Sequence, residues 1–170
     1  MRLILVAEAP PAEAADGPYA RGMPFHLETT LDAFRAAGLP AASRRDLEGR
    51  GIYLTTAIKC AKVGYGVGRP TVEACSFLLE REIDLFPKAE VIMLMGDVAI
   101  GAFNAVARRR TGKRLIPSGP TWKLRAGEYR FEGKRVFPSY LQTGRSYLIE
   151  RSKREMIAAD LRAALALLGE

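Results

Sequence analysis

Residues 3–11 constrain the fold of this chain more than any other segment. Their sequence is LILVAEAPP, a short apolar run that ends abruptly in a glutamate and is followed by two prolines. An apolar run of this length is typical of a buried strand, and the prolines end it. Open α/β sheets bind ligands at the carboxyl ends of their strands, so we expect Glu8 to lie at a functional edge. The alternative is that Glu8 only caps the turn that follows.

Apolar segments alternate with segments of helical periodicity along the rest of the chain. We interpret residues 52–58, 91–95 and 135–137 as further strands. The periodic segments are residues 29–37, 71–86 and 97–108, with a C-terminal helix whose apolar face includes Ile157, Leu161 and Leu165. Residues 121–136 alternate instead, which indicates hairpin-like β structure. The order predicts a single α/β domain over residues 1–170, a mainly parallel central sheet with helices on both faces.

The composition is that of an ordinary globular chain, with 48% hydrophobic and 26% charged residues among 170. The sequence contains no apolar run of the roughly 18 residues that a membrane span needs, and its N-terminus does not resemble a secretory signal. We therefore expect a cytoplasmic protein that does not bind membranes and is a monomer. Two cysteines are too few for a disulfide framework.

The positive charge is concentrated in one part of the chain. Residues 101–154 contain 14 Lys and Arg against three Glu, although the whole chain carries only +7. A concentrated basic surface is typical of a protein that binds a polyanion such as DNA. The candidates for contact with the DNA backbone lie in the segment RRRTGKR, namely Arg108, Arg109, Arg110, Lys113 and Arg114. The alternative is a solvated face, because a helix dipole favours cations at a helix C-terminus in any case.

Residues 12–26 are rich in Ala, Gly and Pro and lack helical periodicity, so we interpret them as a long functional loop. Phe25 lies at its end beside His26, which is the single histidine of the sequence. An aromatic ring beside a site can stack on a flat base. It can equally be a plug that seals the apolar core under the loop.

Five short motifs, in this order and spacing, resemble those of the uracil-DNA glycosylase superfamily, particularly its family 4 members, which carry an iron-sulfur cluster. The chain has AEAPPAEA for the family's Gly-Glu-Ala-Pro-Gly, GMPF for Gly-x-Pro-Phe and TTAIKC for Thr-Asn-Val-Val-Lys-Cys. It also has PKAEVIMLMGDVAI for the family's Pro-Lys-x-Ile-x-x-Leu-Gly-x-x-Ala, and FPSYL in the place of His-Pro-Ser. The resemblance covers nearly the whole chain and implies the fold of that superfamily.

The resemblance also implies an activity and site residues. Such enzymes extrude a base from DNA and hydrolyse its N-glycosidic bond through an oxocarbenium-like transition state. Glu8 matches the carboxylate that stabilises this cation and orients the attacking water. Phe25 matches the stacking ring, and His26 and Thr56 are further candidates for contact with the base.

Two departures from the family concern the base. Thr56 stands where the family has an asparagine that recognises the base edge, and a hydroxyl cannot offer the paired donor and acceptor of an amide. Phe137 stands where the family has the histidine that supports the leaving base, and its ring offers no donor. The candidates to replace that donor, or to contact DNA from the same loop, are Ser139, Tyr140, Gln142 and Arg145.

A third departure concerns the cluster. Cys60 and Cys75 match two of the four family ligands, and the other pair has no counterpart in this sequence. We therefore expect no [4Fe–4S] cluster, no metal and no other cofactor.

The sequence thus leads to one hypothesis and two alternatives. The first is a DNA glycosylase that flips uracil or a related deaminated base and acts in base-excision repair. The second is a non-catalytic member of the superfamily that binds DNA or nucleotides. The third is hydrolysis of small nucleosides, which would not need the basic segment.

Overall fold

The central sheet has five strands in the order β2-β1-β3-β5-β4. The computed structural model describes residues 1–61, 64 and 66–169 of the chain. The strands are β1 (Leu3–Ala7), β2 (Ile52–Thr56), β3 (Val91–Met95), β4 (Tyr129–Phe131) and β5 (Lys134–Ser139). Each neighbouring pair is parallel except β4 and β5, which form an antiparallel hairpin at one edge. The predicted α/β class with a mainly parallel sheet is confirmed.

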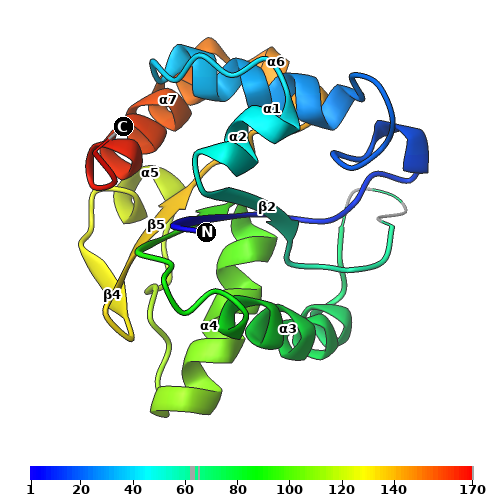
Figure 1. The fold of residues 1–170 in the computed structure, drawn as a ribbon. Coiled ribbons are helices and arrows are strands. Elements are labelled where there is room, and N and C mark those ends of the chain that lie inside the picture. The colour runs from blue at the N-terminus through cyan, green and yellow to red at the C-terminus, as the bar shows by residue number, and fades with distance from the viewer. Residues whose placement is uncertain (62–63, 65, 170) are drawn as a thin grey trace.

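Helices cover both faces of this sheet (Figure 1). One face carries α1 (Phe25–Ala36), α2 (Arg44–Gly49), α6 (Arg145–Ile149) and α7 (Arg151–Ala166). The other carries α3 (Arg69–Asp84), α4 (Asp97–Thr111) and α5 (Thr121–Leu124). A short 3-10 helix, η1 (Ala14–Asp16), interrupts the long loop that follows β1. Within the described residues, no helix combines the length and the apolarity that crossing a bilayer requires.

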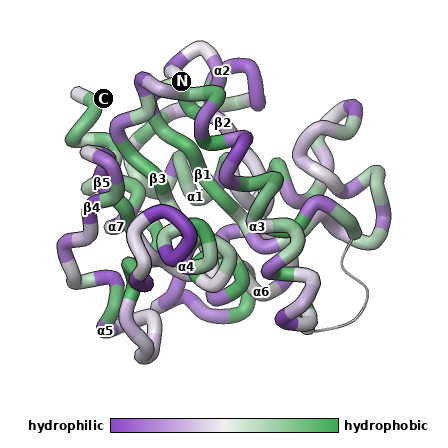
Figure 2. Tube along the Cα trace, turned by 90° about the horizontal axis from the view of Figure 1, so that it is seen from below, coloured by the Kyte–Doolittle hydropathy of each residue, from purple (hydrophilic) through white to green (hydrophobic). Residues whose placement is uncertain are grey.

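The two cores follow from the alternation of side chains along the strands. Leu3 and Leu5 of β1 pack on the α1 and α7 side, whereas Ile4 and Val6 pack on the α3 and α4 side. Because both faces are covered, all five residues of β1 and all five of β3 are buried. Figure 2 shows these hydrophobic residues gathered in the middle of the molecule. Continuous apolar runs are therefore what a central parallel strand requires.

Several predicted boundaries were wrong, each for a local reason. Helix α1 begins at Phe25 rather than 29, and the hydroxyl of Thr29 donates to the Phe25 carbonyl at 3.1 Å. No side chain caps α1 at Pro24, so the sequence has no capping signal at its start. Residues 121–124 form α5 rather than a strand, because Leu124 packs into the core as one helical turn. Strand β2 ends at Thr56, two residues earlier than expected.

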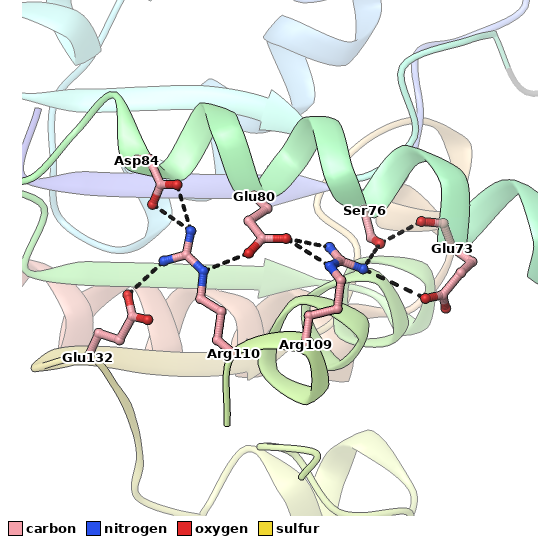
Figure 3. A network of polar contacts seen from close by, with 7 residues as sticks. All are labelled: Glu73, Ser76, Glu80, Asp84, Arg109, Arg110 and Glu132. Atoms are coloured by element: carbon pink, nitrogen blue, oxygen red, sulfur yellow. Dashed lines mark hydrogen bonds and ion pairs between the residues drawn. The ribbon is translucent and has the colours of Figure 1, made fainter. Parts of the chain in front are cut away.

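Two adjacent arginines at the end of α4 join that helix to α3 (Figure 3). Arg109 donates to Glu80 at 2.8 Å and to the Ser76 hydroxyl at 2.8 Å. Arg110 donates to Glu80 at 2.7 Å and also binds Asp84 and Glu132. The Glu80 side chain is 19% exposed and is shared by both guanidinium groups. Burial by itself would raise the pKa of Glu80, but the hydrogen bonds from Arg110 and Arg109 outweigh it and hold the pKa below its ordinary value.

We expect Glu80→Gln to lower the free energy of unfolding at pH 7 by about 1–3 kcal/mol, because two guanidinium groups lose their shared negative charge and one of the two acceptor oxygens. A carboxyl group whose pKa is lowered by folding contributes stability above its unfolded pKa and loses that contribution as the pH falls through its folded pKa. The difference between variant and wild type should therefore shrink as the pH falls from 7 to about 4 or below. Urea unfolding across this range measures it.

Glu73→Gln is the matched control on the same helix. Glu73 is 3.7 Å from Arg109 and its side chain is 55% exposed, so the change should cost no more than about 1 kcal/mol. Equal losses of unfolding free energy in the two variants would contradict the role of Glu80 as the shared partner of Arg109 and Arg110. So would a Glu80→Gln effect that does not depend on pH.

Candidate active site

The carboxyl ends of the parallel strands meet at one edge of the sheet. Strand β1 is followed by Glu8, β2 ends at Thr56, and β3 is followed by Gly96. The chain leaves β1 toward β2 on one side and later reaches β3 on the other, so the β1/β3 boundary is a topological switch point. Such a point is where open α/β sheets bind ligands. Glu8 therefore lies where the topology places a functional crevice.

Gly96 lets the Glu8 carboxylate lie against the turn between β3 and α4. A Cβ atom on Gly96 would come within 2.7 Å of Glu8 Oε1 and 3.1 Å of its Cδ. The backbone there has φ 97° and ψ 166°, a region that glycine alone occupies readily. The Gly96 amide donates to the Ser139 carbonyl at 2.9 Å, and the Glu8 carbonyl accepts from the Ile58 amide at 2.9 Å. Backbone bonds thus fix this edge of the sheet.

Glu8 and His26 line one cavity of about 220 Å³. We call it the outer cavity; Pro10, Pro11, Leu141, Thr143 and Gly144 are also part of its wall. Gly144 has φ 74°, and a Cβ there would come within 3.4 Å of His26 Nε2. The loop after β5 can therefore approach the imidazole closely. The outer cavity therefore brings together the carboxylate that follows β1 and the imidazole in the first turn of α1.

The imidazole of His26 is held in a partly buried position at the start of α1. The backbone carbonyl of His26, and not its ring, accepts a hydrogen bond from the Thr30 hydroxyl at 2.7 Å. Burial lowers the pKa of His26, and the charge of Asp16 raises it by a smaller amount. The ring is therefore neutral at pH 7 and carries one N–H donor.

A much smaller cavity of about 20 Å³ adjoins the outer one, with which it shares Ala9, His26 and Thr143. We call it the inner cavity; it is about the space that one water molecule needs. Thr56 and Gln142 line it, and Gln142 is only 1% exposed. Gln142 Nε2 donates to Thr30 Oγ1 at 3.4 Å. Within the described part of the chain, Gln142 Oε1 accepts no hydrogen bond.

A third hollow of about 540 Å³ lies outside edge strand β2, under the loop that contains Tyr19. Its polar floor is formed by Glu82, which accepts the Tyr53 hydroxyl at 2.7 Å and the Thr55 hydroxyl at 2.8 Å. Lys59 forms an ion pair with the same Glu82. Burial raises the pKa of Tyr53, and the hydrogen bond to the Glu82 carboxylate raises it further. Neither Glu8 nor His26 lines this hollow, although it shares Pro10 and Pro11 with the outer cavity and Thr56 with the inner one.

The structure brings four of the candidate residues together and leaves others apart. Glu8 and His26 meet in the outer cavity, and His26, Thr56 and Gln142 meet in the inner one. Phe25 begins α1 beside His26 and is half-buried, but it does not line any of these three cavities.

The candidates on and after β5 have different surroundings. Ser139 is fully buried, and its hydroxyl donates to Asp160 Oδ2 at 2.6 Å, on the α7 side. Tyr140 packs against the core, and the centroid of its ring lies 5.5 Å from Lys153 Nζ. Arg145 is exposed at the start of α6, directly after Gly144.

Phe137 lies inside the sheet and not at its edge. It pairs with Met93, which in turn pairs with Leu5 of the central strand. It belongs to the core on the α1 and α7 side, so a polar donor at this position would be buried among apolar side chains. A donor for a ligand beside Glu8 must therefore come from another segment.

The basic segment predicted to contact DNA does not lie at this site. Helix α4 begins beside Gly96 and runs back along the sheet for about 20 Å, so Arg108–Arg110 lie at the opposite edge. Arg109 and Arg110 are held there by Glu80, Asp84 and Glu132. These bonds supply a structural role for the two side chains. Arg108, Lys113 and Arg114 share the remote location.

The two cysteines are free thiols. Cys60 is exposed and Cys75, on α3, is half-buried. Among the described residues, no group of three or more His, Cys, Asp or Glu side chains could hold a metal ion.

Sequence reasoning missed the glycines that shape the site. Gly96 accommodates Glu8 and Gly144 accommodates His26, and both have positive φ. The available signal for Gly96 was its position directly after the predicted strand 91–95, whereas Gly144 had no such signal. Thr143 and Leu141, which line the outer cavity, carried no signal of their own.

Comparisons with known proteins agree with this architecture. Residues 1–164 match the family model described as the uracil DNA glycosylase superfamily. The chain is also 28% identical over 179 aligned residues to a Thermus thermophilus protein named type-5 uracil-DNA glycosylase. That alignment covers 99% of this chain and 76% of the relative. The comparisons support the superfamily, and not family 4 in particular.

We expect NMR titration of His26 to give a pKa below 6.5, because burial disfavours the charged ring. Asp16→Asn should lower this pKa further, since the carboxylate favours the imidazolium. Asp32→Asn, lower on α1, is the control and should leave the titration unchanged. A His26 pKa at or above 6.5 would show that the ring is solvated.

Gly96→Ala should lower the free energy of unfolding by about 1–3 kcal/mol, because the backbone is strained for alanine and the new Cβ meets Glu8. Gly101→Ala is the control, since Gly101 lies inside α4 and its new Cβ would have ordinary contact with Val72 at 3.8 Å. That change should be neutral or stabilising. Urea unfolding of both variants measures these changes. A Gly96→Ala variant as stable as wild type would contradict the close approach of Gly96 to Glu8.

Proposed function

Because this chain belongs to the uracil-DNA glycosylase superfamily, we propose that it hydrolyses the N-glycosidic bond of uracil or a related deaminated base in DNA. The observation that carries the proposal is the Glu8 carboxylate at the β1/β3 switch point, facing a cavity shared with His26. The family and the type-5 relative support a glycosylase-like function in general. A role in base-excision repair follows from the proposed reaction.

The proposed chemistry assigns a role to each of these two groups. When the bond between C1′ and the base nitrogen breaks, its electron pair leaves with the base and positive charge develops on the sugar. The Glu8 carboxylate stabilises that charge and orients a water molecule toward C1′. The proton of this water passes to the carboxylate or to solvent. The neutral His26 donates a hydrogen bond to the departing base, in the manner of a preorganised oxyanion donor.

We propose that the base reaches the outer cavity by extrusion from the DNA. A cavity of about 220 Å³ beside Glu8 has room for a planar ring, whereas the inner cavity does not. Phe25 is adjacent to His26 in the first turn of α1, so its ring is a candidate to stack on the extruded base at the rim.

We propose that the DNA strand lies over the loop after β5 and over α6, not over the end of α4. Arg145 is exposed directly after Gly144, which lines the outer cavity, so it is the basic side chain best placed for a phosphate. The nearby N-terminal turns of α7 add Arg151 and Lys153.

We also propose that the reaction needs no cofactor. Two thiols supply half of the ligands that a [4Fe–4S] cluster requires, and the proposed chemistry uses only side chains and water. A cytoplasmic, monomeric protein remains our expectation.

The second candidate function is binding of DNA or nucleotides without catalysis. It is favoured by Thr56, which cannot recognise a base edge as an amide does, and by the small volume of the inner cavity. Both functions share the same site, so one assay separates them.

The test is cleavage of single-stranded and duplex oligonucleotides that contain uracil, hypoxanthine or xanthine. We expect wild type to release at least one of these bases, and Glu8→Gln to lower the single-turnover rate at least about 100-fold, because it removes the charge that stabilises the cation. Glu13→Gln is the matched control: Glu13 is exposed on the same loop and does not line the outer cavity. It should keep the wild-type rate.

If wild type releases none of the bases but retains DNA with a steep salt dependence, the binding function replaces the catalytic one. If Glu8→Gln and Glu13→Gln cleave equally well, Glu8 is not the catalytic carboxylate.

A further inference from the structure

We propose that the carboxamide of Gln142 recognises the ring N–H of a deaminated base bound beside Glu8. This inference rests on the proposed function and deepens it, because it names the residue that recognises the base and the ring position that it reads. It also assigns a role to a residue from the loop after β5, which lines the inner cavity together with Thr56.

Gln142 is a polar side chain in a fully enclosed position. It is 1% exposed, and it lines the inner cavity together with His26, Thr56 and Thr143. A buried carboxamide offers one acceptor and two N–H donors in a fixed plane. It is retained at such a depth only when its groups find partners.

The hydrogen bonds around Gln142 leave its oxygen open. The Thr30 hydroxyl donates to the His26 carbonyl at 2.7 Å, so its own oxygen can accept from Gln142 Nε2, at 3.4 Å. This orients the amide nitrogen toward α1. No donor in the described part of the chain reaches Gln142 Oε1. A buried acceptor without a donor is costly in the free protein, which indicates that a ligand supplies the donor.

The two cavities place Gln142 at the inner end of a space whose outer part has room for a base. The inner cavity adjoins the outer one through Ala9, His26 and Thr143. A base whose ring occupies the outer cavity beside Glu8 would direct its far edge to the inner cavity, where Gln142 lies. The oxygen then meets the ring position between the two carbonyl groups of uracil.

An acceptor at that place selects by protonation of the ring nitrogen. Uracil, hypoxanthine and xanthine carry an N–H there, whereas cytosine and adenine present a lone pair. An oxygen facing a lone pair gains no hydrogen bond and is repelled. Gln142 would therefore distinguish uracil from cytosine and hypoxanthine from adenine, but not xanthine from guanine, because guanine carries the same ring N–H.

The test measures binding of three probes to wild type and to Gln142→Met by NMR titration. 1-Methyluracil carries the ring N–H, 1,3-dimethyluracil has it blocked, and 1-methylcytosine has a lone pair in its place. We expect wild type to bind 1-methyluracil at least about tenfold more tightly than either of the others, and Gln142→Met to reduce that preference to less than about threefold. Leu148→Met, at an exposed position on α6, controls for the introduced residue.

Thermal unfolding provides the readout that a purely structural role would not give. Methionine has a similar volume and no unpaired acceptor, so Gln142→Met should unfold at the same or a higher temperature than wild type. If the inner cavity instead serves only to hold a bridging water, the variant should unfold at a lower temperature and the probe preference should not change.

The proposal is overturned if wild type binds 1-methyluracil no better than 1,3-dimethyluracil, if it binds none of the probes, or if Gln142→Met keeps the preference. Oligonucleotide cleavage distinguishes this failure from failure of the proposed function. Cleavage by wild type and Gln142→Met at equal rates would reject Gln142 alone. Probe selectivity that depends on Gln142, without cleavage of any oligonucleotide, would reject the catalytic function alone.

Discussion

Hydrogen bonding of β1 to β2 on one side and to β3 on the other determines where every other part of the site lies. This central strand pairs along its length with both neighbours, and all of its residues are buried. Its carboxyl end is therefore fixed, and Glu8 follows at the switch point. The glycine after β3 then leaves room for the carboxylate, and the backbone bond from Gly96 to Ser139 connects β5 to the same edge.

The two edges of the sheet have different physical roles. At the amino edge, Arg109 and Arg110 are neutralised by Glu80, Asp84 and Glu132, so the most basic run of the sequence stabilises the packing of α4 on α3. At the carboxyl edge, Glu8, His26 and Gln142 surround open space. A run of adjacent arginines in the sequence therefore does not by itself indicate the surface at which a polyanion would bind.

The carboxyl edge also gives up stability that an apolar site would keep. The Gln142 oxygen is buried without a donor from the described residues, and burial disfavours the charged form of His26. Unmet polar groups of this kind are typical of sites that are completed by a ligand. The contrast with the satisfied ion pairs of α3 and α4 supports a functional interpretation of this edge.

The sequence by itself determined the class of the fold and the position of Glu8. Strands buried on both faces need continuous apolar runs, and a carboxylate after such a run can only lie at a sheet edge. The start of α1 escaped prediction because no side chain caps the helix at Pro24. Only the tertiary structure decided that His26 faces Glu8, that Gln142 is buried beside Thr56, and that Arg109 and Arg110 bind acidic partners. Each of these contacts joins segments far apart in the chain or on different helices, and spacing along a sequence has no information about the partner that folding brings to a side chain.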